Sequence, residues 1–459
     1  MMTNELAALI SQNAGTEPHS VALQLDDRQC TWETLQTDIE RFAHHLHQQG
    51  VGTNSRVLVI GRNQWEVLHL YLSCLWLGAV AVVVNRFPQS TLKAIAKQVG
   101  ATHYYPFSDD DLLSSSTTLD RFNYSRSSAG SLLPAPMELA SVVLSSGSTG
   151  TPKAVVHDAN AHIHSAQGVC ELMQWHRYDN ALLTLPLYHV SGLGMVWRWL
   201  FSGSCLSISD KPQTLSIPVT VTSMVATQLQ RWLAEPYASP IKILLGGSYI
   251  DPNLVEQARL QGASCYVGYA MTEMASTICA KAFDGQHGVG QALQGREVAL
   301  IEGEVAVRGP MLAKGVFVDG VLTPLATKDS WYLTNDLGHF RDGQWFIVGR
   351  RDNAFISGGE SIHCEEIESA LLSTGDFAQV LVVAVEDDEF GFRPVALYTP
   401  SHAFSRTKTE QKLQTSLIKF KWPIDYYPIP PSMQGGVKLN RKQLTQWVKQ
   451  HRQQVLRRT

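Results

Sequence analysis

A loop of glycine, serine and threonine that ends in lysine is the segment of this chain best suited to chemistry. Its residues are Ser145, Ser146, Gly147, Ser148, Thr149, Gly150, Thr151, Pro152 and Lys153. Glycine allows a positive φ and a close backbone approach, so successive N–H groups can converge on an anion, while hydroxyls and the lysine add donors. This composition predicts a loop that binds the phosphates of a nucleotide. For the loop taken alone, a flexible Ser/Gly hairpin is the alternative.

The residues on either side of the loop predict two β-strands. Residues 140–144 and 154–156 are mostly apolar and rich in valine, so we expect the loop to cap a hairpin. A P-loop kinase or ATPase instead needs a Gly-Lys-Ser/Thr sequence that opens a helix. Here Pro152 precedes the lysine and Ala154 follows it, which excludes that class of nucleotide-binding protein.

The composition is that of an ordinary globular enzyme. The 459 residues are 44% hydrophobic and 17% charged, which indicates about three domains with a large core. Seven cysteines occur without a Cys-x-x-Cys pair, so neither a disulfide framework nor a structural zinc site is expected, and the cytoplasm is the predicted compartment. The first fifteen residues lack the basic and apolar regions of a signal peptide.

One apolar segment has nearly the length of a membrane span. Residues 67–84 contain no acidic or basic residue apart from a histidine, but Gly78 interrupts them, and 56–60 before them is typical of a strand. We therefore predict a strand, a buried helix and a second strand, and no membrane span.

Charge is distributed unevenly along the chain. From 401 to 459 there are twelve Lys and Arg against two acidic residues, whereas the first 400 residues carry 25 against 39. A basic region facing an acidic one suits a polyanionic small molecule bound between them, and a solvated basic helix end is the alternative. The basic residues are not interleaved with aromatics, which argues against a nucleic-acid partner.

The order of predicted elements indicates an α/β fold. Strands at 242–245 and 264–267 flank a helix at 251–262, and the strand ends should form a crevice for a ligand. Short alternating runs in 297–345 predict a small, β-barrel-like antiparallel subdomain. We thus predict a large N-terminal domain of layered α/β sheets (1–350), which includes this subdomain, and a small mobile α+β C-terminal domain (351–459).

Four further segments follow the loop in a fixed order. They are 269–273 (Tyr-Ala-Met-Thr-Glu), 331–336 (Trp-Tyr-Leu-Thr-Asn-Asp), 349–352 (Gly-Arg-Arg-Asp) with Gly358-Gly359-Glu360, and 438–441 (Lys-Leu-Asn-Arg). Together with the loop they resemble the acyl-adenylate-forming (AMP-binding) superfamily of acyl-CoA synthetases, luciferases and peptide-synthetase adenylation domains. The resemblance spans nearly the whole chain and implies ATP, Mg²⁺ and coenzyme A as reactants and cofactor.

The resemblance assigns the nucleotide site. It implies that Thr272 bonds the α-phosphate, that Glu273 holds Mg²⁺, and that Asp336 and Arg350 take the ribose hydroxyls. A carboxylate is a hard ligand suited to Mg²⁺; the alternatives are that Glu273 is a helix N-terminal charge and Asp336 a turn former. Tyr269 resembles the aromatic residue that stacks on adenine. Room for the base would be left by Gly246, Gly247 and Gly268.

The resemblance also assigns the moving parts. Lys438 would be the adenylation lysine, whose loss is expected to cost about 10²- to 10³-fold in rate. Asp352 matches the hinge, and its rotation would bring Gly358 and Gly359 to the CoA channel. His189 matches a position that controls access of the carboxylate. The chain departs from the usual pattern at three loop positions, which are Ala270, Val437 and Cys364.

Two less general segments, 189–200 and 275–281, resemble the o-succinylbenzoate-CoA ligases of menaquinone biosynthesis. On a helix, Arg198 shares a face with Ser191 and Gly194, and its guanidinium can bind a second carboxylate of the substrate bidentately. A snorkelling arginine is the alternative. Ser276 and Thr277 could donate to the ligand or merely cap the following turn.

Together with these residues, the resemblance implies an ATP-dependent, AMP-forming ligase that joins o-succinylbenzoate to coenzyme A. Another aryl or short-chain acid, or a stand-alone adenylation enzyme that loads a carrier protein, are the alternatives. A catalytically inactive AMP-binding module is disfavoured because Lys438, Thr272, Glu273 and Asp336 are all present. The histidines at 44, 45 and 47 and at 157, 162 and 164 lack partner ligands, so no zinc is expected there.

Overall fold

The computed structural model describes residues 3–26, 28–106, 117–122, 132–145, 152–237, 240–247, 250–433 and 439–456. The predicted phosphate loop from Ser146 to Thr151 and the predicted adenylation lysine Lys438 lie outside the described residues. Their roles stay predictions, and the structural statements below concern the described ranges.

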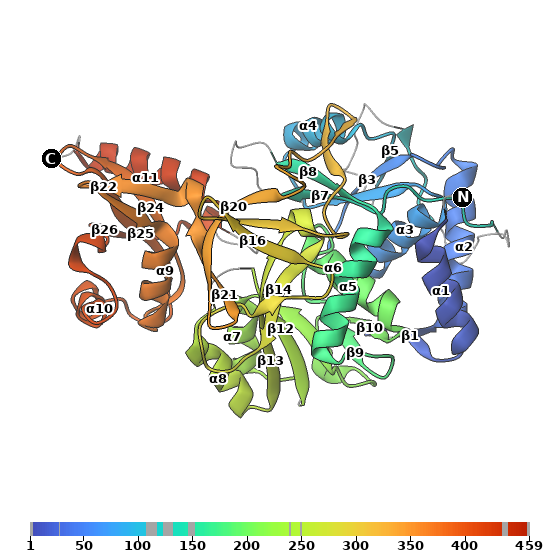
Figure 1. Ribbon diagram of the computed structural model, residues 1–459. Helices are drawn as coiled ribbons and strands as arrows, with labels where there is room; N and C mark the ends of the chain where they lie inside the picture. Colours follow the sequence, from blue (N-terminus) through green and yellow to red (C-terminus); the bar gives the residue numbers. More distant parts are fainter. Residues whose placement is uncertain are drawn as a thin grey trace.

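A nine-stranded sheet forms the centre of the molecule and is mostly parallel (Figure 1). Its helices occupy the connections, as the alternation of strand and helix patterns in the sequence predicts. The strands are, in spatial order, β15 (Gln291–Ala292), β14 (Ser276–Ala282), β13 (Ala263–Met271), β12 (Ile241–Leu245), β11 (Val221–Met224), β9 (Asn180–Leu182), β10 (Cys205–Ile208), β1 (Val21–Leu25) and β2 (Gln29–Thr31). The predicted order of strand, helix and strand is confirmed by β12, α8 (Pro252–Leu260) and β13.

Helix α6 (Val190–Ser202) is buried from Gly192 to Leu200 and lies beside α5 (Ala159–Met173) in Figure 1. A helix that is apolar on all sides needs neighbours on all sides. Trp197 Nε1 donates to Tyr71 Oη at 3.0 Å, and Trp199 Nε1 donates to the Ala22 carbonyl at 2.9 Å. Trp199 also stacks on Trp32, with ring centroids 5.3 Å apart. The aromatic residues therefore fix both the position and the rotation of α6.

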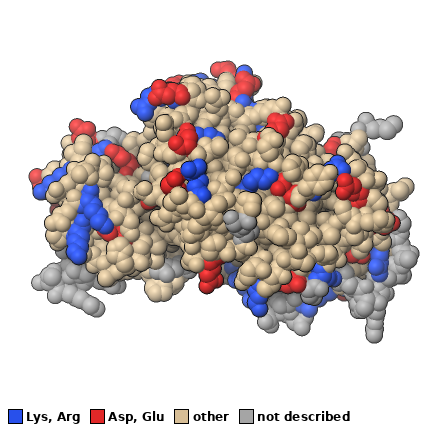
Figure 2. Space-filling model, turned by 90° about the horizontal axis from the view of Figure 1, so that it is seen from below, with Lys and Arg blue, Asp and Glu red and all other residues tan. Residues whose placement is uncertain are grey.

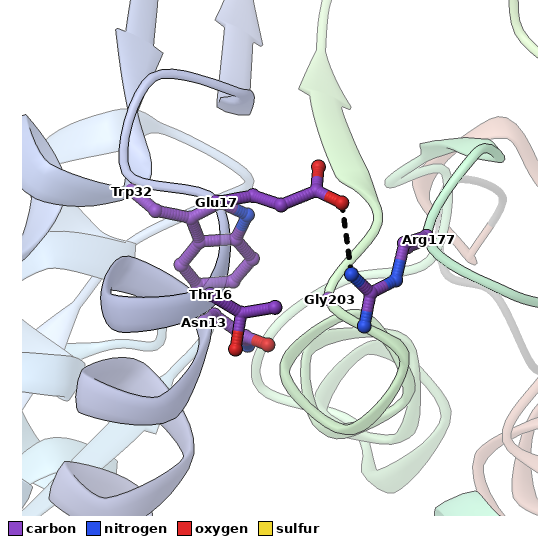
Figure 3. Close-up of a pocket in the computed structure, with 6 residues that line it drawn as sticks. All are labelled: Asn13, Thr16, Glu17, Trp32, Arg177 and Gly203. Carbon is purple, nitrogen blue, oxygen red and sulfur yellow. Dashed lines mark hydrogen bonds and ion pairs between the residues drawn. The ribbon is translucent and has the colours of Figure 1, made fainter.

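The C-terminal end of α6 is anchored to the N-terminal helix α1 (Glu5–Thr16). Asn13 Nδ2 donates to the Leu200 carbonyl at 2.9 Å, which satisfies one of the last carbonyls of the helix. Beside this contact is a small pocket, shown in Figure 3, where Arg177 Nη1 lies 2.8 Å from Glu17 Oε1. The remaining residues that line the pocket are Thr16, Trp32 and Gly203. None of the lining residues belongs to the predicted active site.

A second sheet contains the segment that has nearly the length of a membrane span. Strand β3 (Arg56–Ile60) pairs in parallel with β4 (Val80–Val84), and the buried helix α3 (Trp65–Trp76) connects them. The predicted unit of strand, buried helix and strand is confirmed. The sheet is completed by β5 (His103–Tyr105) and β6 (Thr117–Thr118), and α2 (Trp32–Gln48) and α4 (Gln89–Val99) flank it in the chain. No helix in the described ranges is long and apolar enough to cross a membrane.

The hairpin predicted around the phosphate loop is confirmed. Strand β7 (Ser141–Ser145) pairs antiparallel with β8 (Lys153–His157), with Ser145 opposite Lys153. On its other edge β8 pairs with β18 (Gly315–Val318), which in turn pairs with β19 (Val321–Thr323).

The antiparallel strands expected in 297–345 are also present. Four of them form one open sheet in the order β16 (Glu297–Ile301), β17 (Glu304–Arg308), β20 (Tyr332–Arg341) and β21 (Gln344–Arg350). Strands β18 and β19 belong to a different sheet, because β18 pairs with the edge of β8. The region is therefore divided between two sheets and does not form a closed barrel. Helix α7 (Ala226–Ala234) completes the part of the chain before residue 350.

The residues after 350 build a separate group of elements, at the left in Figure 1. Their sheet has the order β23 (Glu360–His363), β22 (Ala354–Ser357), β25 (Gly391–Pro400) and β24 (Phe377–Asp387), and β26 (Asp425–Pro428) pairs with β25. Around it lie α9 (Cys364–Ser373), α10 (Arg406–Leu413) and α11 (Arg441–Leu456). Two hydrophobic clusters are built from these residues alone. On the face shown in Figure 2, basic and acidic side chains are interspersed.

His69 on α3 provides a test of the buried packing. Its ring stacks on Trp65, with centroids 4.5 Å apart, and burial lowers its pKa from 6.5 to about 3. As the pH falls below 6.5, His69 binds a proton in the unfolded chain but not in the folded protein. Protonation therefore stabilises the unfolded state, and the free energy of unfolding should fall by about 2 kcal/mol between pH 7 and pH 5. His69→Phe keeps the stacking and should remove that part of the acid sensitivity in urea unfolding. An equal loss in both proteins would contradict the assignment.

Candidate active site

Three glycines lie at or near the carboxyl ends of β12 and β13. A Cβ atom added at Gly246 would lie 3.5 Å from the Gly268 carbonyl oxygen, and one added at Gly268 would lie 2.9 Å from that of Cys279. Gly247 has a φ of +91°, which favours glycine. Gly268 thus lets β14 approach β13 closely, and Gly246 and Gly247 lie at the carboxyl end of β12, at the edge where open α/β sheets bind ligands.

Tyr269, Asp336 and Arg350 meet beside these glycines. Tyr269 Oη donates a hydrogen bond to Asp336 Oδ2, and Asp336 stands opposite Arg350 across β20 and β21, with Arg350 Nη1 3.6 Å from Asp336 Oδ1. Burial raises the pKa of Asp336, and burial together with the Asp336 charge raises the pKa of Tyr269 well above its usual value. Tyr269 therefore remains a donor, and Asp336 keeps one carboxylate oxygen near the arginine.

Thr272 and Glu273 follow β13 in a short 3₁₀ turn, η2 (Thr272–Met274). Tyr332 Oη donates to Glu273 Oε1 at 3.3 Å, and the backbone N–H of Ala313 donates to the Glu273 carbonyl at 2.8 Å. Glu273 is close enough to raise the pKa of Tyr332, although burial contributes more. No group of three or more possible metal ligands occurs in the described part of the chain, so Glu273 would have to share a Mg²⁺ with phosphate oxygens and water.

The base of the predicted phosphate loop lies next to this turn. Ala313 and Lys314 connect the two, because Ala313 bonds to the Glu273 carbonyl and the Lys314 N–H donates to the Val156 carbonyl of β8 at 2.9 Å. Lys153 begins β8. The fold therefore holds the described ends of the loop, Ser145 and Lys153, in the same region as Thr272 and Glu273.

Arg198 lies at the centre of a second group of residues. Its side chain is only 1% exposed, so the snorkelling alternative is wrong. Nη1 donates to Ser223 Oγ at 3.2 Å, and Nη2 donates to Ser276 Oγ at 3.2 Å and Thr277 Oγ1 at 3.3 Å. Within the described ranges no carboxylate forms an ion pair with it, and its Nε has no partner. Burial lowers the pKa of Arg198 to about 10, so it remains charged at neutral pH.

Gly194 lets Ser276 and Arg198 pack closely against α6. A Cβ atom at Gly194 would lie 3.3 Å from Ser276 Cβ and 3.4 Å from Arg198 Nη2. Ser191 is in the first turn of α6 and makes no hydrogen bond with Arg198. His189 is the N-cap residue of α6, and its ring lies 4.7 Å from that of Tyr188. Gly194 and Arg198 of the predicted face of α6 thus lie together, whereas Ser191 and His189 lie at the start of the helix.

Ser276 and Thr277 accept hydrogen bonds from Arg198, so they belong to the arginine site. Ser223 was not predicted. It stands near the carboxyl end of β11, the parallel neighbour of β12, and the rule that ligands bind at carboxyl ends of strands was the signal that could have found it.

The predicted hinge residue Asp352 is paired with Arg350. Arg350 Nε donates to Asp352 Oδ1 at 2.9 Å, and Nη2 donates to Oδ2 at 3.2 Å. Partial burial opposes ionisation, but Arg350 holds the pKa of Asp352 below its ordinary value. Gly358 and Gly359 form the turn between β22 and β23 with φ of +56° and +88°. One arginine therefore contacts both the predicted ribose carboxylate and the predicted hinge.

Comparison with known proteins agrees with this geometry. The model of the AMP-binding enzyme family matches residues 10–317. The chain belongs to the AMP-binding enzyme family. The predicted resemblance is therefore confirmed.

Individual relatives cover almost the whole chain. The 2-succinylbenzoate–CoA ligase of Haemophilus influenzae is 40% identical over 91% of this chain and 92% of its own. A structure of a variant of E. coli MenE with bound OSB-AMS is 35% identical, covers 96% of this chain and 98% of that chain, and has a TM-score of 0.87. MenE of Bacillus subtilis is 25% identical and covers 95% of this chain. Its complex with the acyl-adenylate intermediate OSB-AMP has a TM-score of 0.84 and 97% of that chain covered. Its complex with ATP and magnesium has a TM-score of 0.83, and 98% of that chain is covered.

Asp336 gives a direct test of the nucleotide site. Asp336→Asn removes the charge that would strengthen bonds to two ribose hydroxyls, and charged hydrogen bonds contribute about 1.5–3 kcal/mol each. We expect the KM for ATP to rise about 10- to 100-fold in a steady-state assay. Asp342→Asn, at the exposed turn of the same β20–β21 hairpin, is the matched control and should behave as wild type. Unchanged ATP dependence in Asp336→Asn would remove this residue from the site.

Proposed function

We propose that the protein ligates o-succinylbenzoate to coenzyme A with ATP, a step of menaquinone biosynthesis. The carboxylate of the succinyl arm attacks the α-phosphate and releases pyrophosphate, and the CoA thiol then attacks the acyl carbon and releases AMP. The observation that carries the proposal is the buried Arg198, which has hydroxyl partners and no carboxylate among the described residues.

The substrate supplies what the arginine lacks. A buried cation without a counterion is costly, and the benzoate carboxylate of the acid would provide one with bidentate geometry. A fatty acid has no group that can do this. The names of the relatives support the same acid. Ser223, Ser276 and Thr277 would then orient the guanidinium, and Gly194 would lie beside the acid.

The nucleotide is assigned to the open strand ends. Thr272 binds the α-phosphate, Glu273 shares Mg²⁺ with the phosphates, Asp336 and Arg350 bind the ribose, and Tyr269 covers the adenine. When bound, Mg²⁺ neutralises phosphate charge. The loop from Ser145 to Lys153 holds the phosphates, Lys438 stabilises charge as adenylation proceeds, and His189 controls entry of the acid.

The two steps require two arrangements of the chain. We assign residues 1–350 and 351–459 to separate domains with a hinge at Asp352, and Gly358 and Gly359 to the CoA channel. The hydrophobic clusters of the C-terminal residues, which include no residue before 350, support this division. The reaction is assigned to the cytoplasm, in keeping with seven cysteines that are all free.

Thioester formation by the purified protein tests the proposal. With ATP, Mg²⁺ and CoA, we expect AMP and the CoA thioester from o-succinylbenzoate, and at least 100-fold lower kcat/KM with benzoate, succinate or a medium-chain fatty acid. Preference for another acid would contradict the substrate assignment and leave the adenylation chemistry standing. Adenylate formation without transfer to free CoA would favour a carrier-loading enzyme.

Arg198→Met tests the pocket itself. Loss of a buried charge pair costs about 2–5 kcal/mol, so we expect the KM for o-succinylbenzoate to rise about 100-fold while the KM for ATP changes less than twofold. Arg198→Lys keeps the charge without the planar fork and should lie between wild type and Arg198→Met. An equal rise in both KM values would indicate that Arg198 serves the structure and not the acid.

A further inference from the structure

A second arginine is buried behind the proposed acid pocket, which is the site of Arg198, Ser223, Ser276 and Thr277. Arg296 follows β15 and is 6% exposed. Its Nε donates to the Thr277 carbonyl at 3.0 Å, and Nη2 donates to the Ser165 carbonyl at 2.9 Å. Nη1 donates to the carbonyls of Gln294 and His164 at 2.7 and 3.2 Å. Within the ranges that the structure describes, no carboxylate lies within ion-pair distance of it. Arg296 is therefore a second buried cation whose hydrogen bonds go to neutral carbonyls.

The segment that Arg296 holds is conformationally strained. Ala275 has a φ of +50° and Ser276 a φ of +122°, and neither is glycine. Such residues persist where the surroundings fix them, and they concentrate at functional sites. Ser165 Oγ donates to the Ala275 carbonyl at 2.8 Å, while Arg296 binds the Thr277 carbonyl. The strained Ser276 is thus held on both sides by α5 and Arg296, which turns its hydroxyl and that of Thr277 toward Arg198.

Helix α5 is shaped to admit the guanidinium. A Cβ atom at Gly168, within α5, would lie 2.4 Å from Arg296 Nη1. The glycine lets Arg296 reach the carbonyls of the preceding turn, His164 and Ser165. The arginine therefore packs against Gly168 of α5 and binds the backbone at the start of β14.

Arg198 also acts on Arg296 through charge. Burial, and next the nearby Arg198, lower the pKa of Arg296 to about 10, so both remain cations at neutral pH. Thr277 lies between them, with its hydroxyl on Arg198 and its carbonyl on Arg296. Two buried cations with neutral partners make this part of the protein favourable for an anion.

We propose that Arg296 is a positioning and specificity residue for the acid pocket: it fixes the Ala275–Thr277 segment and adds charge that favours a substrate with a second carboxylate. The inference rests on the proposed function and extends it to a residue that does not itself touch the substrate.

The test compares two acids that differ only in the ring carboxylate, o-succinylbenzoate and 4-oxo-4-phenylbutanoate. In Arg296→Met we expect the ratio of their kcat/KM values to fall at least tenfold, with the KM for ATP within twofold of wild type. Arg296→Lys retains the charge and should recover part of the ratio. A purely structural role would lower kcat/KM for both acids equally and leave the ratio unchanged.

Two milder variants keep the test valid if Arg296→Met does not fold. Gly168→Ala should displace the guanidinium without deleting it, and Ser165→Ala removes the bond to Ala275, so each should lower the ratio several-fold. In the Arg296→Met background, Gly168→Ala should have little further effect. Arg177→Met, at the pocket in Figure 3, is the control for loss of an arginine elsewhere and should leave the ratio unchanged.

The outcomes separate this inference from the proposed function. If wild type shows no preference for the dicarboxylate, the proposed function fails and the inference falls with it. If wild type shows the preference and Arg296→Met, Gly168→Ala and Ser165→Ala all retain it, the inference alone is overturned.

Discussion

The burial of the Arg198 charge is the constraint on which the pocket depends. Removing a guanidinium from water costs several kcal/mol unless partners compensate, and here the protein offers three hydroxyls and a thioether. The helix that carries the arginine is held by hydrogen bonds of Trp197 and Trp199 and, at its end, by a hydrogen bond from Asn13. Such rigid packing suits a substrate that brings the counterion, because a side chain that is already held in place loses little freedom on binding.

One turn of the chain joins the acid pocket to the nucleotide site. Strand β13 carries Tyr269 near its carboxyl end, η2 carries Thr272 and Glu273, and β14 begins with Ser276 and Thr277. The residues that would bind adenine and phosphate are thus within a few positions of those that bind Arg198. The strain at Ala275 and Ser276 lies where the chain reverses between the two groups of residues. A rigid turn at this point therefore fixes the position of the acid site relative to the nucleotide site.

The sequence predicted what local pattern and motif chemistry control. The hairpin on either side of the phosphate loop and the buried α3 between two strands follow from periodicity and are confirmed. The roles of Tyr269, Glu273 and Asp336 come from short motifs and stay predictions. Ser223, Ser165 and Arg296 could not be found in this way, because their roles arise from contacts between distant elements. The pairing of β18 with β8 was missed for the same reason, since an open edge belongs to the assembled fold. The phosphate loop and Lys438 remain predictions from sequence.

The central claim is that Arg198 awaits a carboxylate. A crystal structure of the protein with o-succinylbenzoate and AMP tests this claim most directly. The account predicts the benzoate carboxylate within hydrogen-bond distance of the Arg198 guanidinium, with Ser223, Ser276 and Thr277 around it and the succinyl carboxylate turned toward the nucleotide. A bound acid whose carboxylates both lie away from Arg198, with the arginine still on its three hydroxyls, would contradict it.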